Sequence, residues 1–258
     1  MDRERARLFD REAERYDRSR PGYPDAVIDE VVGPSPCGLS VLDIACGTGL
    51  ASRPMAQRGA DVVGVELNPR MAEIAERCGI PTEVAAFESW DPAGRTFDRV
   101  ICAQAWHWLD PDVSLAKAAS VLRPGGRLCL FWSFGHYPDA LADALRAAYE
   151  RAAPGDSSGL VIGHAANRAS DLTDDFSELE DPLRQSDKLG APRAQSFPWR
   201  RTYTTDEWID ELGSHSDHAA LPPDVRARLF EAIAATIDGF GGTFEMPYRT
   251  VLISATRV

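Results

Sequence analysis

The chain has 258 residues, enough for one large domain, and its 44% hydrophobic and 26% charged residues are typical of an ordinary globular protein. Forty acidic residues against 28 basic ones give a net charge of −12, which argues against a nucleic-acid partner because such partners are held by basic patches. No apolar run approaches the roughly 18 to 20 residues that span a bilayer, and the charged N-terminus lacks the apolar segment of a secretion signal.

The five cysteines are odd in number and scattered, and no two of them form a Cys-x-x-Cys pair. This pattern predicts a reduced, cytoplasmic protein with neither a disulfide framework nor a zinc site. The histidines other than His107 form no helical pair with a carboxylate, so we expect no metal site.

Apolar runs alternate with helical patterns through the first half of the chain. Strands are predicted at 40–45, 61–67, 82–87, 97–105 and 126–132, because these runs are short, rich in Val, Ile and Leu, and mostly non-alternating. Helical spacing with a glycine near the end predicts helices at 50–59, 68–79 and 110–126. This alternation predicts a parallel, doubly wound α/β sheet.

The second half changes character. We predict helices at 137–153, 204–213 and 222–242, a strand at 195–204 and a final strand at 243–258. No internal repeat or linker marks a second domain, so residues 1–258 are expected to form a single domain with an insertion at 137–195.

The insertion is acidic: residues 137–190 carry 11 acidic and five basic side chains, which is half of the total charge imbalance. Its periodicity is weak to about residue 192, which suggests few buried contacts. We expect this segment to act as a mobile lid over a ligand pocket.

The stretch LDIACGTGLA, residues 42–51, follows the first predicted strand and contains two glycines, Gly47 and Gly49. Ligands of open parallel sheets bind beyond the carboxyl ends of the strands, and glycines there let the backbone approach the ligand closely. The dehydrogenase fingerprint G-x-G-x-x-G would need glycine where Ser52 stands. Glu66 ends the second strand 17 residues after Gly49, where a carboxylate can accept both hydroxyls of a ribose.

Together these features resemble the class I S-adenosylmethionine-dependent methyltransferases, over most of the chain. The resemblance implies a Rossmann-like seven-stranded sheet with an antiparallel last strand, and S-adenosylmethionine as cofactor. LRPGG (122–126) is a further hallmark of the family, and Ala45 stands where its members most often have a first glycine. The cofactor-binding residues that the family's first three motifs imply are Asp43, Ala45, Gly47, Thr48, Gly49, Glu66, Leu67, Ala86, Phe87 and Glu88.

Two other stretches resemble the type 11 and trans-aconitate-methyltransferase-like groups, which act on small molecules. ERYDRSRPGYP (14–24) resembles their N-terminal cap, here expected over 1–24, in which Tyr16, Arg20 and Tyr23 fold over the cofactor. AQAWHWLD (103–110) resembles their fourth motif, which implies that Ala103 lies near the sulfonium and that His107 faces the acceptor as the candidate catalytic residue.

Several of these residues also have purely structural interpretations. His107 could instead cap the helix that begins near Pro111, Tyr16 and Tyr23 could simply anchor an N-terminal helix, and Trp106 is interpreted as core. The leading hypothesis is methyl transfer to the oxygen, nitrogen or carbon of a small-molecule acceptor. The alternatives are a non-methylating enzyme that uses the same pocket, such as a cyclase, and a cofactor-binding protein without turnover. The acceptor and the oligomeric state are left open.

Overall fold

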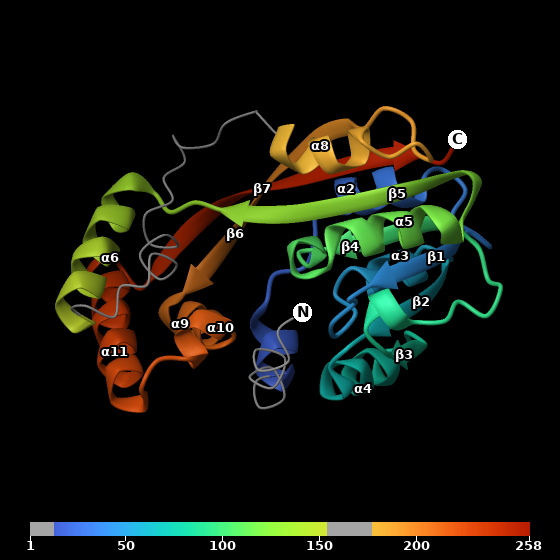
Figure 1. Cartoon of the computed structure of the whole chain (residues 1–258). Coiled ribbons are helices and arrows are strands. Elements are labelled where there is room, and N and C mark those ends of the chain that lie inside the picture. The colour runs from blue at the N-terminus through green and yellow to red at the C-terminus, as the bar shows by residue number, and fades with distance from the viewer. Residues whose placement is uncertain (1–12, 154–176) are drawn as a thin grey trace.

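The structure, a computed structural model, describes residues 13–153 and 177–258, and its centre is one seven-stranded sheet (Figure 1). The strand order is β3-β2-β1-β4-β5-β7-β6. Strands β1 to β5 run parallel, and β7 is antiparallel to both of its neighbours. The predicted doubly wound sheet with an antiparallel last strand is thereby confirmed. The strands are β1 (Ser40–Ile44), β2 (Asp61–Glu66), β3 (Thr82–Val84), β4 (Phe97–Ala103), β5 (Leu122–Gly135), β6 (Arg193–Thr204) and β7 (Thr243–Thr256).

Helices surround the sheet, and several begin at a side chain that caps them. Asn68 accepts hydrogen bonds from the backbone N–H groups of Arg70 and Met71, and Pro69 occupies the first helical position. The described α-helices are α2 (Asp25–Val32), α3 (Ser52–Gln57), α4 (Pro69–Arg77), α5 (Pro111–Val121), α6 (Asp139–Ala152), α8 (Ser177–Arg184), α9 (Thr205–Gly213), α10 (Ser216–Ala219) and α11 (Pro223–Gly239). Residues 13–19 are also helical.

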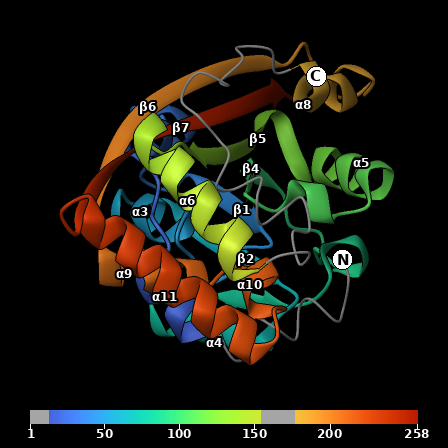
Figure 2. The same cartoon turned by 90° about the vertical axis from the view of Figure 1, so that its left-hand side faces the viewer.

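Both faces of the parallel strands are buried, which explains their continuous apolar sequence. On β1, Leu42 and Ile44 belong to one core cluster, and Val41 belongs to the cluster on the other face. A third cluster joins α6, α9 and α11 to the ends of β6 and β7. In Figure 2, α6 and α11 lie side by side across this part of the molecule.

Three of the element boundaries that differ from prediction involve strand pairing or short 3-10 helices. β3 ends at Val84, and the residues after it form a short 3-10 helix, η1 (Phe87–Ser89). β4 ends at Ala103 and leads into a second one, η2 (Trp106–Trp108). The segment 122–126, predicted as the end of a helix, is instead the start of β5, because Leu122 pairs with Phe97 on β4. Pairing across the sheet overrides the helical spacing there.

The predicted insertion and cap lie partly outside the described residues. Of 137–195, the structure describes α6, α8 and the first residues of β6, and residues 154–176 lie outside it. Residues 1–12 of the predicted cap also lie outside it. No helix in the described part of the chain is both long and apolar enough to cross a membrane.

Candidate active site

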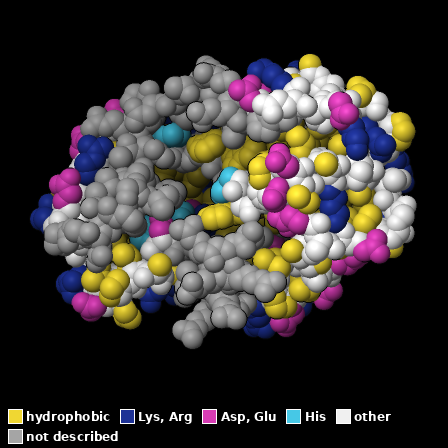
Figure 3. All heavy atoms as spheres, viewed as in Figure 1, with side chains coloured by type: hydrophobic (Ala, Val, Ile, Leu, Met, Phe, Trp, Pro, Cys, Tyr) yellow, Lys and Arg dark blue, Asp and Glu magenta, His cyan; other side chains and the backbone are white. Residues whose placement is uncertain are grey.

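A cavity of about 480 Å³ opens at the carboxyl ends of β1, β4 and β5. That is within the range of small-molecule sites, roughly 300 to 1,000 Å³. Figure 3 shows the hollow from the side seen in Figure 1. The residues with predicted site roles that line it are Tyr16, Arg20, Tyr23, Asp43, Ala45, Gly47, Thr48, Ala103 and His107.

Two glycines of the loop after β1 serve different purposes. Gly47 has a φ of 57°, and a Cβ built on it would meet no atom within 4 Å, so its side of the loop is open to a ligand. Gly49 has a φ of 87°, and its Cβ would lie 3.4 Å from Ile80 and 3.6 Å from Ala75, so this glycine lets the loop pack on α4 and its following turn. Of these two glycines, only Gly47 lines the cavity.

Ala45 adopts a backbone conformation that glycine adopts without strain. Its φ is 53°, in the left-handed region where a side chain costs about 1 to 2 kcal/mol. Gln104, after β4, has a φ of 59° and also lines the cavity. Strained backbone of this kind clusters at ligand sites.

Glu66 braces the glycine loop. Its Oε2 accepts a hydrogen bond from the backbone N–H of Gly47 at 2.9 Å, and its Oε1 accepts one from the N–H of Asn68 at 2.7 Å. The side chain is 5% exposed, and burial raises the pKa of its carboxyl against the lowering effect of these N–H groups. Glu66 therefore fixes the loop conformation, although it does not itself line the cavity.

Asp43 and Thr48 present buried polar atoms to the cavity. The hydroxyl of Ser52 donates to Asp43 Oδ2 at 2.6 Å, whereas Asp43 Oδ1 and Thr48 Oγ1 have no hydrogen-bond partner within the described structure. Burial raises the pKa of the Asp43 carboxyl to about 7, and the nearby charge of Glu66 adds to this. Since buried polar atoms are rarely left unpaired, these two atoms fit a polar ligand.

The segment 13–23 closes one side of the cavity and is tied to both halves of the molecule. Asp17 pairs with Arg53 at 2.5 Å, next to the glycine loop, and Arg18 pairs with Asp210 of α9 at 2.8 Å. Tyr16 and Arg20 meet in a cation–π contact, and the ring of Tyr23 packs edge-on against Phe131 at 4.9 Å.

The end of β4 supplies Ala103, Gln104 and His107. Gln104 donates from Nε2 to the carbonyl of Ser133 at 2.9 Å, which fixes the chain after the strand. His107 lies beside Trp108, and partial burial lowers the pKa of its imidazole. Asp110 caps α5 with its own side chain, so the alternative that His107 caps this helix is wrong. Trp106 is buried in the core as interpreted.

The remaining predicted cofactor residues lie outside the cavity wall. These are Gly49, Glu66, Leu67, Ala86, Phe87 and Glu88. Phe87 is buried in the core and stacks on Trp90, and Glu88 accepts a hydrogen bond from the N–H of Asp110 at 3.2 Å. Their cofactor roles stay predictions.

A second wall of the cavity consists of residues that the sequence analysis did not single out. It is mostly aromatic and acidic, and its residues come from α9, from β7 and from around α6 and α10. They include Tyr137, Trp208, Glu211, His215, Asp217, Met246 and Tyr248. The Thr204–Glu207 capping box in the sequence indicates where α9 begins, but no local motif indicates which face of α9 borders a cavity.

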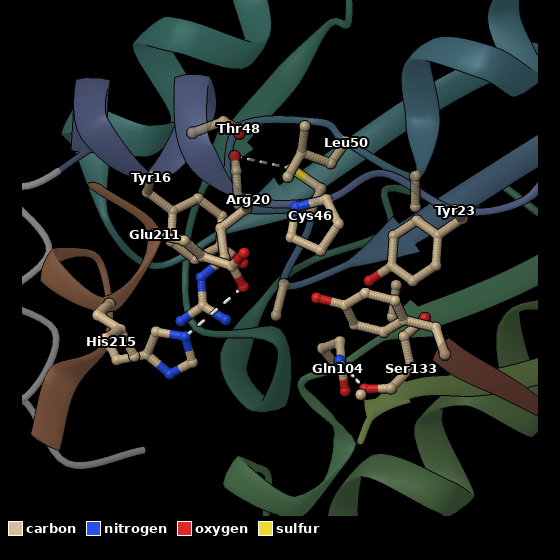
Figure 4. A pocket seen from close by; sticks show the side chains of 18 of the residues that line it. Tyr16, Arg20, Tyr23, Cys46, Thr48, Leu50, Gln104, Ser133, Glu211 and His215 are labelled. Carbon is tan, nitrogen blue, oxygen red and sulfur yellow. Dashed lines mark hydrogen bonds and ion pairs between the residues drawn. The ribbon is translucent and has the colours of Figure 1, made fainter. Parts of the chain in front are cut away.

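Within the described ranges, no three His, Cys, Asp or Glu side chains gather as a metal site would require. The expectation that the histidines other than His107 form no pair with a carboxylate one helical turn away is wrong, because His215 Nε2 lies 3.8 Å from Oε1 of Glu211. Figure 4 shows how the labelled side chains are distributed: Tyr16, Arg20, Glu211 and His215 gather on one side of the cavity, and Gln104 and Ser133 lie across from them.

Comparison with known proteins identifies the family. A family model described as a methyltransferase domain matches residues 41–126. An uncharacterized methyltransferase from Mycobacterium tuberculosis is 30% identical over 249 residues, which are 93% of this chain and 92% of the relative. The chain belongs to the class I S-adenosylmethionine-dependent methyltransferases. Its methyl donor is therefore S-adenosylmethionine, and the unpaired atoms of Asp43 and Thr48 beside the open face of Gly47 fit that polar ligand.

Other methyltransferases match over part of the chain or in fold alone. A ubiquinone biosynthesis O-methyltransferase from Xanthomonas axonopodis pv. citri is 35% identical over 103 residues, 37% of this chain and 43% of that protein. A structure described as a type II methyltransferase from Anaeromyxobacter dehalogenans superposes with a TM-score of 0.61 at 23% identity, covering 92% of this chain and 97% of that one. A Haemonchus contortus phosphoethanolamine N-methyltransferase 2, solved with S-adenosyl-L-methionine, has a TM-score of 0.55 at 15% identity and covers 97% of this chain and 56% of that one.

Proposed function

We propose that the protein transfers the methyl group of S-adenosylmethionine to a small-molecule acceptor bound in the cavity described above. The observation that carries this proposal is the cavity's pair of unlike walls. One wall is the glycine loop with its unpaired polar atoms, and the other is mostly aromatic and acidic. A polar cofactor and a second molecule can thus lie next to each other in one enclosure, which is the geometry that transfer requires.

The residues that hold the cofactor in this proposal are those of the first wall and its cap: Tyr16, Arg20, Asp43, Ala45, Gly47, Thr48 and Ala103. Glu66 keeps the loop in position and is our candidate for the ribose hydroxyls, with Gly49, Leu67 and the segment 86–88 on the adenosine side by resemblance. Bound S-adenosylmethionine supplies an electrophilic methyl group for in-line displacement by an oxygen, nitrogen or carbon nucleophile.

His107 is the candidate catalytic residue for the acceptor. It lines the cavity after β4, and the lowered pKa of its imidazole leaves the ring neutral at pH 7, the form that accepts a proton. A base is needed only where the acceptor is protonated at neutral pH. Otherwise alignment of the two reactants carries the rate.

The test is incubation with methyl-labelled S-adenosylmethionine and a panel of small alcohols, amines, carboxylic acids and carbon acids. Transfer of label to a small molecule supports the proposal. An altered product without label would indicate a non-methylating enzyme, and binding alone would indicate a cofactor-binding protein. Either of these two results would overturn it.

A further inference from the structure

Glu211 is a buried carboxylate that faces the cavity from α9. Its side chain is only 3% exposed, and its Oε2 has no hydrogen-bond partner among the described residues. His215 Nε2 lies 3.8 Å from Oε1. Burial raises the pKa of this carboxyl, and the charge of Arg20 and a hydrogen bond from Tyr203 act against that rise. A buried carboxylate oxygen without a hydrogen-bond partner is costly, so Oε2 is placed to accept a hydrogen bond from a ligand, in addition to the nearby charge of Arg20.

The walls around Glu211 are aromatic. Tyr137, Trp208 and Tyr248 line the same cavity, and the rings of Tyr137 and Trp208 meet edge-on at 5.5 Å. The ring faces carry partial negative charge and attract organic cations. Aromatic rings beside a carboxylate are therefore a favourable site for an ammonium group.

The charged side chains of the cavity also favour a cationic ligand. Asp43, Glu211 and Asp217 are its acidic side chains, and among the described lining residues Arg20 alone carries a permanent positive charge. Arg20 donates from Nε to the hydroxyl of Ser214 at 2.9 Å and lies over the ring of Tyr16. Next to Glu211, an anionic group of a ligand would be repelled by the carboxylate, whereas a cationic group would be attracted to it.

We propose that Glu211 binds a positively charged nitrogen, an organic ammonium group. This rests on the proposed function, and two groups can supply that chemistry: the α-ammonium of the methionine part of the cofactor, and an amine of the acceptor. The position of Glu211 suits both sources, because it lies beside Tyr16 and Arg20 (Figure 4) and lines the same cavity as the aromatic residues.

The first arm of the experiment tests the cofactor as the source. Calorimetry compares S-adenosylhomocysteine with its deaminated analogue, in which hydrogen replaces the α-ammonium group. If Glu211 binds this group, the wild type prefers S-adenosylhomocysteine by about tenfold to a hundredfold, and Glu211→Gln removes the preference. Asp206→Asn removes the same charge from an exposed position on the same helix and should keep it.

The second arm tests the acceptor. The protein is saturated with S-adenosylhomocysteine, and 2-phenylethylamine is compared with its neutral counterpart 2-phenylethanol. If Glu211 binds an acceptor amine, the wild type and Asp206→Asn prefer the amine by about tenfold or more, and Glu211→Gln binds both compounds equally. Circular dichroism and thermal melting check that Glu211→Gln is folded, and the wild-type preferences stand as a test without that variant.

A preference that depends on Glu211 in either arm supports the proposal and identifies the source of the ammonium group. The proposal is overturned if the wild type shows neither preference, or if Glu211→Gln keeps every preference that the wild type shows. A wild type that binds no S-adenosylhomocysteine would contradict the proposed function itself. Binding of S-adenosylhomocysteine without an ammonium preference would contradict this inference alone.

Discussion

The two walls of the cavity are built in different ways. The glycine-loop wall comes from one short stretch, residues 43–51, whose backbone is held by Glu66 and whose start is held by Ser52. The aromatic wall combines Tyr137, Trp208 and Tyr248, which are up to 111 residues apart in the chain and meet only in the folded protein. The comparison teaches that the cofactor side is encoded by a local motif, whereas the other side is a product of packing.

One short segment connects the two walls. The segment 13–23 reaches the glycine loop through Asp17 and Arg53, and it reaches α9 through Arg18 and Asp210. The Arg18 side chain is 64% exposed, so this second pair contributes little stability by itself. Through these pairs the segment contacts both walls.

The largest expected effect is on the glycine-loop wall. Glu66→Ala should weaken binding of S-adenosylmethionine and S-adenosylhomocysteine by about 2 to 4 kcal/mol, because it removes the hydrogen bonds that we propose to the ribose hydroxyls and also the acceptor that fixes Gly47. Calorimetry measures this, with Glu73→Ala on the exposed face of α4 as the control. Unchanged affinity would remove Glu66 from the site.

The next largest effect is expected at His107, which lines the cavity after β4. If His107 is the base, His107→Ala should lower turnover by about a hundredfold and leave cofactor affinity nearly intact. The pKa of His107 lies below the ordinary 6.5, so the wild-type rate should fall only below that pH, as the ring becomes protonated, and the variant should lack this limb. If His107 only orients the acceptor, KM rises more than kcat falls. Full activity with an unchanged profile would make it a packing residue.

A third prediction concerns how burial of Asp43 in the glycine-loop wall changes the stability of the ligand-free protein with pH. The pKa of Asp43 is raised from 3.8 to about 7 in the folded state, so the folded protein holds this proton more tightly than the unfolded chain. The contribution of Asp43 to the free energy of unfolding should therefore fall as the pH rises from about 4 to about 7, by at most about 1.4 kcal/mol per pH unit.

Urea denaturation across this pH range checks the prediction. Asp43→Asn should remove its share of the slope, while the raised pKa values of Glu66 and Glu211 keep contributing in the same direction. Asp61→Asn, at the exposed start of β2, is the matched control. An identical slope in wild type and Asp43→Asn would show that the carboxyl is not destabilised by burial.

The smallest effect is expected at Ala45. Ala45→Gly relieves a left-handed conformation that costs about 1 to 2 kcal/mol, but glycine adds about 0.5 to 1 kcal/mol of entropy loss on folding. The net change in the free energy of unfolding should be a stabilisation of at most about 1.5 kcal/mol, measured by urea denaturation. A destabilised variant would show that the methyl group of Ala45 is needed for packing.

Much of the first half could be predicted from the sequence. The order of strands and helices and the loop at the first strand end follow from apolar runs, capping residues and the glycine motif, and the resemblance to the family implied the antiparallel last strand. The boundaries near 87, 106 and 122 could not be predicted, because strand pairing and short 3-10 helices there compete with local spacing on nearly equal terms.

The sequence by itself determined the family, the sheet and the cofactor wall, because a loop of positive-φ residues after a buried strand needs small side chains at fixed positions. Only the tertiary structure decided that Glu211 faces the cavity among aromatic rings. The physical reason is the separation along the chain of the residues that interact. Backbone conformation is set by neighbours in the chain, whereas a cavity wall is set by the packing of helices and strands that meet only after folding.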